Sequence, residues 1–319
     1  MGSTANAATV APGNATATAR GRGGAADTQV RYRYAQVDEV KVFYREAGSR
    51  AAPAILLLHG FAASSHMYRD VIAGLADRYH VIAPDLPSFG FTQAPARHAY
   101  AYSFENLART IDRFTVQLGL DRYALMVHDY GAPVGWRLAT AHPQRITALI
   151  SQNGNAYEEG LAAGWAPIRT YWNAPTAEHR AALAEFPTAE TILWQYLEGV
   201  PDPERVPPDG YTLEGLHVSR PGNADIQLDL LLDYATNVAL YPRFQQYFRD
   251  RQPPLLAVWG RHDPYFLPAG AEAWRRDLPE AEIHFYDTGH FALETHADDI
   301  VPVIRAFLDR HLTRQVATP

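Results

Sequence analysis

An α/β fold built on a mostly parallel, doubly wound sheet is predicted for this chain of 319 residues. Several continuous apolar runs end in Gly, Pro or Asp, which is typical of strands buried on both faces. Helical patterns lie between these runs, and the alternation of strands with helices indicates a parallel sheet. The alternation breaks between about residues 155 and 250, where a segment rich in Tyr, Trp and Pro reads as several helices.

The predicted elements follow one another along the chain. Residues 29–48 alternate apolar and polar side chains, which predicts an antiparallel hairpin at the edge of the sheet. Residues 103–120 predict one of the helices, with Ser103 as its N-cap and Gly119 near its C-terminus. Six continuous apolar runs each predict a buried strand: 54–61, 79–92, 123–131, 146–155, 254–264 and 281–293.

Four segments are expected from this pattern. Residues 1–27 are mostly Ala, Gly, Thr and Asn, and they predict a disordered leader because they lack the basic start and apolar core of a secretory signal. Residues 28–154 and 251–319 are expected to form the two parts of the α/β core. Residues 155–250 are expected to form a helical cap over the carboxyl edge of the sheet, where open α/β sheets bind ligands.

The composition narrows the class of protein. A net charge of −7 disfavours a polyanionic partner such as nucleic acid. The absence of Cys excludes disulfides, thiolate catalysis and Cys-ligated metals. No apolar run approaches the roughly 20 residues that a membrane span needs. We therefore expect a cytoplasmic protein without a membrane or nucleic-acid partner, whose oligomeric state, a homodimer included, stays open.

Asp129 stands at the turn between a predicted strand and a predicted helix, in the segment HDYGAPVG. This segment resembles the nucleophile elbow of the α/β-hydrolase fold, in which small residues, here Gly131 and Ala132, allow a tight turn. The side chain at the elbow projects from the top of the sheet, and a Ser or Cys usually occupies the position. Asp129 could instead serve only as the N-cap of the next helix.

Two later strand ends complete a set of nucleophile, acid and base. Asp263 follows a strand in WGRHDPYF, and His290 follows the last strand in DTGHFALE. The chain order of Asp129, Asp263 and His290 is the order of nucleophile, acid and base in this fold. A turn-capping Asp and a buried structural His are the alternatives for the two later residues. Some relatives place the acid after the fourth buried strand, where this chain has Asn153, which cannot ionise.

Over most of its length the chain resembles the α/β-hydrolases of the branch that contains epoxide hydrolases and haloalkane dehalogenases. The resemblance implies an oxyanion hole formed by the backbone N–H groups of Phe61, in the HGF loop, and of Tyr130. Relatives often have Pro at the position of Ala62, and a Gly at the position of Ser88 in the turn DLPSFGFT. The first departure leaves the shape of the HGF loop open, and the role of the turn with Ser88 is expected to be structural.

A carboxylate nucleophile indicates a particular reaction. A carboxylate is a poor nucleophile toward an ester carbonyl, but it attacks a saturated carbon that bears a leaving group, which would give an alkyl ester on Asp129. His290, oriented by Asp263, would then activate the water that hydrolyses this ester. The sequence therefore predicts a hydrolase acting on a small apolar electrophile.

The leaving group distinguishes the two activities of the resembled branch. An epoxide oxygen needs a proton, which epoxide hydrolases supply from Tyr hydroxyls of the cap. The resemblance implies Tyr241, in NVALYPRF, as one acid and Tyr171, in RTYWNAP, as the other. A shift of one helical turn would put Ile168 in the place of Tyr171. Opening of an epoxide to a diol is the predicted function.

A halide leaving group is the main alternative. Dehalogenases commonly hold the halide with a Trp after the nucleophile and an Asn or a second Trp, and this chain has Tyr130 and Phe61 at two of these places. Trp172 keeps a haloalkane substrate open, with His59 and His128 as further candidates for substrate contact. A haloacid is disfavoured, since no Arg directly follows the nucleophile. A ligand receptor or an esterase on the same scaffold are further alternatives. No metal or organic cofactor is expected, because side chains fill every role.

Overall fold

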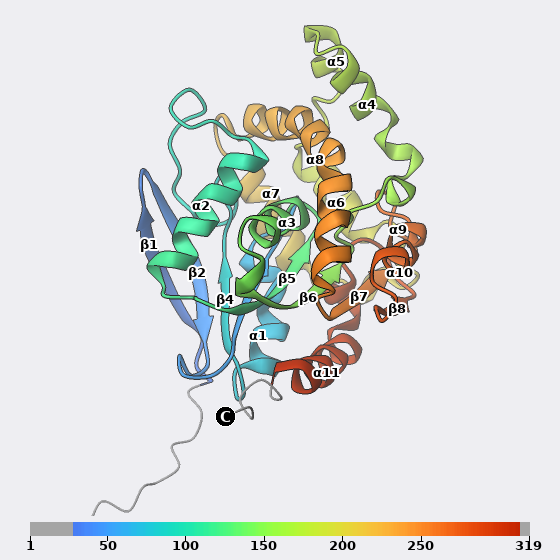
Figure 1. Cartoon of the computed structure of the whole chain (residues 1–319). Coiled ribbons are helices and arrows are strands. Elements are labelled where there is room, and N and C mark those ends of the chain that lie inside the picture. Colours follow the sequence, from blue (N-terminus) through green and yellow to red (C-terminus); the bar gives the residue numbers. More distant parts are fainter. Residues whose placement is uncertain (1–27, 313–319) are drawn as a thin grey trace, which may run out of the picture.

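The computed structural model describes residues 28–312, so the predicted leader, residues 1–27, lies outside the described residues. A single sheet of eight strands runs through the middle of the molecule, in the order β1-β2-β4-β3-β5-β6-β7-β8 (Figure 1). The strands are β1 (Arg31–Val37), β2 (Val40–Ala47), β3 (Ala54–Leu58), β4 (His80–Pro84), β5 (Tyr123–His128), β6 (Ile146–Gln152), β7 (Leu255–Gly260) and β8 (Glu282–Tyr286).

The pairing of the strands confirms the predicted doubly wound sheet. β1 and β2 form the predicted antiparallel hairpin at one edge, and β3 to β8 pair in parallel. The strands β3 to β7 are almost entirely buried, as their continuous apolar runs predict. The last run differs from its prediction: β8 is only half-buried, because it is the second edge strand and has a neighbour on one side only.

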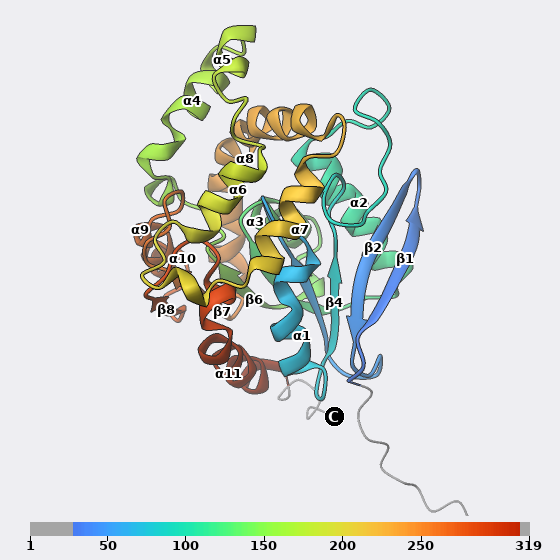
Figure 2. The same ribbon diagram turned by 180° about the vertical axis from the view of Figure 1, so that it is seen from behind.

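Eleven α-helices are described in residues 28–312. They are α1 (Arg69–Leu75), α2 (Phe104–Gln117), α3 (Gly131–Ala141), α4 (Ala166–Asn173), α5 (Ala177–Ala181), α6 (Ala189–Leu197), α7 (Pro208–Val218), α8 (Asn223–Arg251), α9 (Pro268–Glu272), α10 (Trp274–Asp277) and α11 (Ala292–Leu312). Helices α2 and α3 cover one face of the sheet, and α1 and α11 cover the other (Figures 1 and 2). Ser103 caps α2 as predicted, since its hydroxyl accepts a hydrogen bond from the N–H of Asn106.

The helices between β6 and β7 form the upper part of the molecule, where α4 and α5 project from the body (Figures 1 and 2). Helix α8 also contributes to the layer beside the sheet. The ring of Phe248, near the end of α8, packs on the rings of Trp136 in α3 and Trp274 in α10. The ring centroids lie 5.6 Å apart in the first pair and 4.7 Å apart in the second. Helix α8 therefore joins the upper helices to the core without a break.

Within residues 28–312, no helix combines the length and the apolar character that crossing a membrane would take.

Candidate active site

Asp129 lies at the sharp turn from β5 into α3, with a left-handed backbone φ of 45°. The turn is possible because glycines stand where the backbones meet. A Cβ atom on Gly131 would lie 2.1 Å from the carbonyl oxygen of Leu58, and one on Gly60 would lie 2.4 Å from Oδ1 of Asp129. An L-residue with a positive φ is uncommon and costs backbone energy, so the surrounding structure must hold Asp129 in this conformation. This is the elbow that the sequence predicts.

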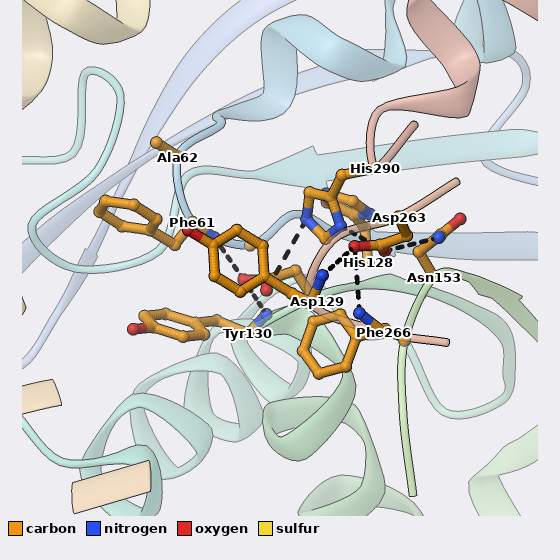
Figure 3. Close-up of polar contacts among 12 residues, drawn as sticks. Phe61, Ala62, His128, Asp129, Tyr130, Asn153, Asp263, Phe266 and His290 are labelled. Carbon is orange, nitrogen blue, oxygen red and sulfur yellow. Dashed lines mark hydrogen bonds and ion pairs between the residues drawn. The ribbon is translucent and has the colours of Figure 1, made fainter. Parts of the chain in front are cut away.

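The two carboxylate oxygens of Asp129 have different surroundings. Oδ1 accepts hydrogen bonds from the N–H of Phe61 at 2.6 Å and from the N–H of Tyr130 at 2.5 Å. Oδ2 lies 3.8 Å from Nε2 of His290. Figure 3 shows Phe61 and Tyr130 on one side of Asp129, and His290 with Asp263 on the other. The two N–H groups predicted for the oxyanion hole thus converge on one point, which Oδ1 occupies.

Asp263, three residues after the end of β7, contacts and orients His290. Nδ1 of His290 lies 2.7 Å from Oδ2 of Asp263, and because a carboxylate only accepts, Nδ1 carries the proton and Nε2 is free to act as a base. Oδ1 of Asp263 accepts from the N–H groups of Tyr265 at 2.8 Å and Phe266 at 3.0 Å. Asn153 donates from Nδ2 to Oδ2 of Asp263 at 2.7 Å (Figure 3). The buried carboxylate therefore has hydrogen bonds on both oxygens.

Burial and charge set the protonation states of the site. Burial raises the pKa of Asp129 to about 6, against the lowering effects of His290 and of the two N–H donors. Burial also disfavours the charged form of His290. The charge and hydrogen bond of Asp263, together with the charge of Asp129, outweigh that effect and raise the pKa of His290. The carboxyl group of Asp129 is thus mostly ionised near neutral pH.

A narrow cavity lies beside Asp129, and residues of the helices between β6 and β7 line it together with residues of the core loops. Most of the lining residues are apolar or aromatic. Gln195 of α6 and Tyr265 are two lining residues with polar groups. The lining residues are Phe61, Asp129, Tyr130, Trp165, Ile168, Phe186, Gln195, Leu231, Tyr265 and His290.

The structure does not bring either predicted cap acid to this cavity. The hydroxyl of Tyr171 accepts a hydrogen bond from Arg180, and Ile168, one turn earlier in α4, lines the cavity instead. The hydroxyl of Tyr241 is buried and accepts from Nδ2 of Asn155 at 3.3 Å. The alternative in which Ile168 takes the place of Tyr171 therefore fits the structure of α4. Neither Tyr171 nor Tyr241 is among the described residues that line the cavity.

The three predicted substrate contacts also lie outside the lining. The indole N–H of Trp172 donates to the carbonyl oxygen of Leu231 at 2.7 Å, so this indole has no N–H left to bind a halide. His59 is fully buried, accepts from the N–H of Leu86 at 2.9 Å and bonds through Nδ1 to the carbonyl of Gly60, so it fixes the HGF loop. Burial lowers the pKa of His59 and keeps the ring neutral.

His128 lies behind the nucleophile. Its Nδ1 donates to the carbonyl oxygen of Gln152 at 2.9 Å, and its ring packs 4.5 Å from the ring of His290. Burial and the neighbouring His290 lower the pKa of His128 well below its usual value. A neutral, fully buried ring of this kind supports His290 and does not reach a substrate.

The sequence analysis missed three polar residues of the site. From the sequence, Asn153 was considered only as a position that lacks a carboxylate. In the structure its side chain donates a hydrogen bond to Asp263. Tyr265 follows Asp263 by two residues, and this position at the end of a parallel strand is the signal that could have revealed it. Gln195 lies in α6, where the sequence shows no pattern that separates it from solvent-facing polar residues.

The departure from the family pattern at Ser88 keeps a left-handed turn. Ser88 adopts a left-handed φ of 80°, the conformation for which relatives have Gly. Asp85 closes this turn by accepting hydrogen bonds from the N–H groups of Ser65 and Phe91, both at 2.7 Å. Within residues 28–312, no three His, Asp or Glu side chains are grouped as a metal site would require.

Fold and site together define an α/β-hydrolase with a carboxylate at the elbow. The family model described as alpha/beta hydrolase fold matches residues 53–297, and the chain belongs to this family.

Several named proteins are similar to the chain. The protein named Uncharacterized hydrolase YNR064C, from Saccharomyces cerevisiae, is 47% identical over 263 residues, which are 81% of this chain and 90% of that protein. Haloalkane dehalogenase 2 of Mycobacterium tuberculosis is 35% identical over 113 residues, 35% of this chain and 38% of its own. Epoxide hydrolase 1 of Caenorhabditis elegans is 27% identical over 143 residues, 44% of this chain and 35% of its own. The solved structure of the epoxide hydrolase CorEH shares the fold with a TM-score of 0.71 at 19% identity, covering 88% of this chain and 99% of that one.

Proposed function

We propose that this hydrolase opens an epoxide to a diol through a covalent ester on Asp129. Oδ2 of Asp129 attacks a ring carbon, the carbon–oxygen bond of the ring breaks, and the released alkoxide takes up a proton. His290 then removes a proton from water, and the water oxygen attacks Cγ of Asp129. The resulting oxyanion is held by the N–H groups of Phe61 and Tyr130. Collapse of this intermediate releases the diol and regenerates the carboxylate.

The observation that carries the proposal is that the two carboxylate oxygens of Asp129 have different hydrogen-bonding surroundings. Oδ1 is held by two N–H groups, whereas Oδ2 faces the cavity beside Nε2 of His290. Attack by Oδ2 leaves Oδ1 as the ester carbonyl oxygen, already in the oxyanion hole. The hydrolytic step then needs no rearrangement of the protein, which is the preorganisation that electrostatic catalysis requires.

The hydrogen-bond donors near Asp129 favour an epoxide over a halide. Halide release needs free N–H donors, but the indole N–H of Trp165 donates to the carbonyl oxygen of Tyr265 and that of Trp172 donates to Leu231. Phe61 has no side-chain donor. The similarity to proteins named epoxide hydrolase and haloalkane dehalogenase supports both leaving groups equally. Haloalkane dehalogenation is therefore the second candidate, and the same experiment distinguishes it.

The test uses His290→Gln, which keeps the nucleophile and removes the base. With styrene oxide, the variant is expected to accumulate an adduct whose mass equals protein plus epoxide, on the peptide that contains Asp129. Incubation with 1-bromobutane should release no bromide. Asp129→Ala is the matched control and should form no adduct. Bromide release with an alkyl adduct, and no reaction with epoxides, would instead establish the dehalogenase.

A single turnover of the wild-type protein in heavy-oxygen water gives an independent check. Because water attacks Cγ of Asp129, the label should enter the carboxylate of Asp129 and not the first diol formed. Label found only in that first diol would refute covalent catalysis.

A further inference from the structure

Tyr265 is the tyrosine of the core loop after β7 that lines the cavity together with Asp129 and His290. Two hydrogen bonds of its main chain fix the position of Tyr265. Its N–H donates to Oδ1 of Asp263 at 2.8 Å, and its carbonyl oxygen accepts from the indole of Trp165 at 3.0 Å. Its ring stands edge-on to the ring of His290, with the centroids 6.3 Å apart. The same acid that orients the base thus positions Tyr265.

The side chain of Gln195 completes the surroundings of the Tyr265 hydroxyl. Gln195 is 2% exposed, and it also lines the cavity. Burial raises the pKa of Tyr265, and a hydrogen bond from Gln195 lowers it, which is the effect of an amide N–H donated to the phenol oxygen. Oε1 of Gln195 has no partner among the described residues. An amide N–H of Gln195 donated to the phenol oxygen would leave the hydroxyl proton of Tyr265 for another acceptor.

The other hydroxyls near the cavity are placed less well to reach a substrate. Those of Tyr171, Tyr241 and Tyr196 belong to residues outside the lining, and that of Tyr196 also donates to the carbonyl oxygen of Ala62 at 3.4 Å. Tyr130 lines the cavity, but its buried hydroxyl has no hydrogen-bond partner among residues 28–312 that would stabilise a phenolate. Tyr265 alone among these five combines a place in the lining with a supporting amide.

We propose that Tyr265 is the catalytic acid that protonates the epoxide oxygen, with Gln195 stabilising the phenolate that forms. This inference rests on the proposed function. As Oδ2 of Asp129 bonds to the ring carbon and the ring opens, the hydroxyl proton of Tyr265 passes to the departing oxygen. In the second step, water adds its OH to Cγ of Asp129, and its proton goes first to His290 and then to the departing diol oxygen. The proton left on the carboxyl of Asp129 returns to Tyr265 through solvent, and the cycle closes.

The experiment measures the alkylation step alone, in the His290→Gln background, where the adduct accumulates. Adding Tyr265→Phe is expected to slow adduct formation from styrene oxide by at least about 100-fold, the usual lower range for loss of a general acid. Adding Gln195→Leu should slow it by about 10-fold, since the acid is kept and only the support of its phenolate is lost. Tyr241→Phe, outside the lining, is the matched control and should stay within about 3-fold.

A second epoxide separates an acid from a packing residue. Trifluoromethyl oxirane releases a much less basic alkoxide, so Tyr265→Phe should slow its reaction by a clearly smaller factor than that of styrene oxide. An equal loss with both epoxides, or adduct formation from styrene oxide within about 3-fold of the background, would overturn the assignment. Failure of the His290→Gln protein itself to form any adduct would refute the proposed function instead, so the two failures are distinct.

Discussion

Asn153 donates a hydrogen bond from its side-chain amide to Oδ2 of Asp263, the same oxygen that binds Nδ1 of His290. The position at which some relatives have the acid thus carries a neutral donor that orients the acid of this chain. Oδ1 of Asn153 in turn accepts from the N–H of Gly260 at 2.8 Å, which fixes the direction of the amide. Asn153 is therefore a positioning residue for the base.

Asn153→Ala should slow hydrolysis of the alkyl ester while leaving its formation nearly unchanged. A hydrogen bond to a charged group is worth about 1.5–3 kcal/mol, which corresponds to roughly 10–100-fold in rate. Asn153→Asp should be more harmful, because two carboxylates in contact cannot both stay ionised. Pre-steady-state rates of the two steps check this, and an Asn153→Ala protein that slows only ester formation would contradict it.

Alkylation should depend on pH through Asp129. Attack needs the carboxylate, so the rate of ester formation is expected to rise with pH through about 6 and then to level off. In His290→Gln the midpoint should move upward, because the charge of His290 lowers the pKa of Asp129 in the native site. Rapid-quench measurements between pH 4 and 9 test both statements. A midpoint that moved downward in the variant would contradict them.

The pH midpoint for hydrolysis of the ester should lie below the midpoint for titration of His290 in the resting protein. The negative charge of Asp129 helps to raise the pKa of His290, and esterification removes that charge. His290 must be neutral to act as a base, so hydrolysis is lost as pH falls through its pKa in the ester. The decay of the alkyl-enzyme against pH, compared with an NMR titration of His290 in the resting protein, measures the difference.

Gly60→Ala should abolish ester formation. The added Cβ would lie 2.4 Å from both Cβ and Oδ1 of Asp129, far inside van der Waals contact, and either the loop or the nucleophile must move. We expect a loss of at least about 100-fold, the scale of moving a reacting group by about 1 Å. Gly164→Ala, where the nearest atom is 3.4 Å away, is the control and should keep the wild-type rate.

Arg69→Met should destabilise the fold. Arg69 forms a two-pronged pair with Glu294, whose side chain is only 2% exposed. Removing one partner of a buried pair typically costs about 3–5 kcal/mol. The exposed pair of Arg113 and Asp38 is the control, and Arg113→Met should cost no more than about 1 kcal/mol in urea unfolding.

The same variant should respond to pH. Burial already raises the pKa of Glu294 above its usual value, and Arg69 lowers it. Without Arg69 the folded-state pKa rises further above the unfolded one, so the folded state binds the extra proton at acidic pH. The stability deficit of Arg69→Met should therefore shrink as pH falls toward the folded-state pKa. A deficit that grew in that direction would contradict this account.

The sequence was sufficient for the sheet and for the proximity of Asp129, Asp263 and His290, because parallel strands end at one edge of the sheet. It was insufficient for the positions of side chains in the helices between β6 and β7. In α4 a shift of one turn exchanges Tyr171 for Ile168, and both are compatible with the same apolar pattern. The direction of the Trp172 indole depends on a carbonyl of Leu231, 59 residues away in the chain. Such pairings between distant segments are tertiary and leave no local signal.

The position of Oδ1 between the N–H groups of Phe61 and Tyr130 has one more consequence. In serine enzymes the corresponding donors bind the carbonyl oxygen of an acyl substrate. In this protein they already bind Oδ1 of Asp129. Fluorophosphonate reagents, which mark serine hydrolases by phosphonylating the elbow hydroxyl, find neither a hydroxyl nor an empty receptor for the P=O group. A survey with such reagents should therefore not label this protein, because they detect a serine hydroxyl and not the scaffold that holds it.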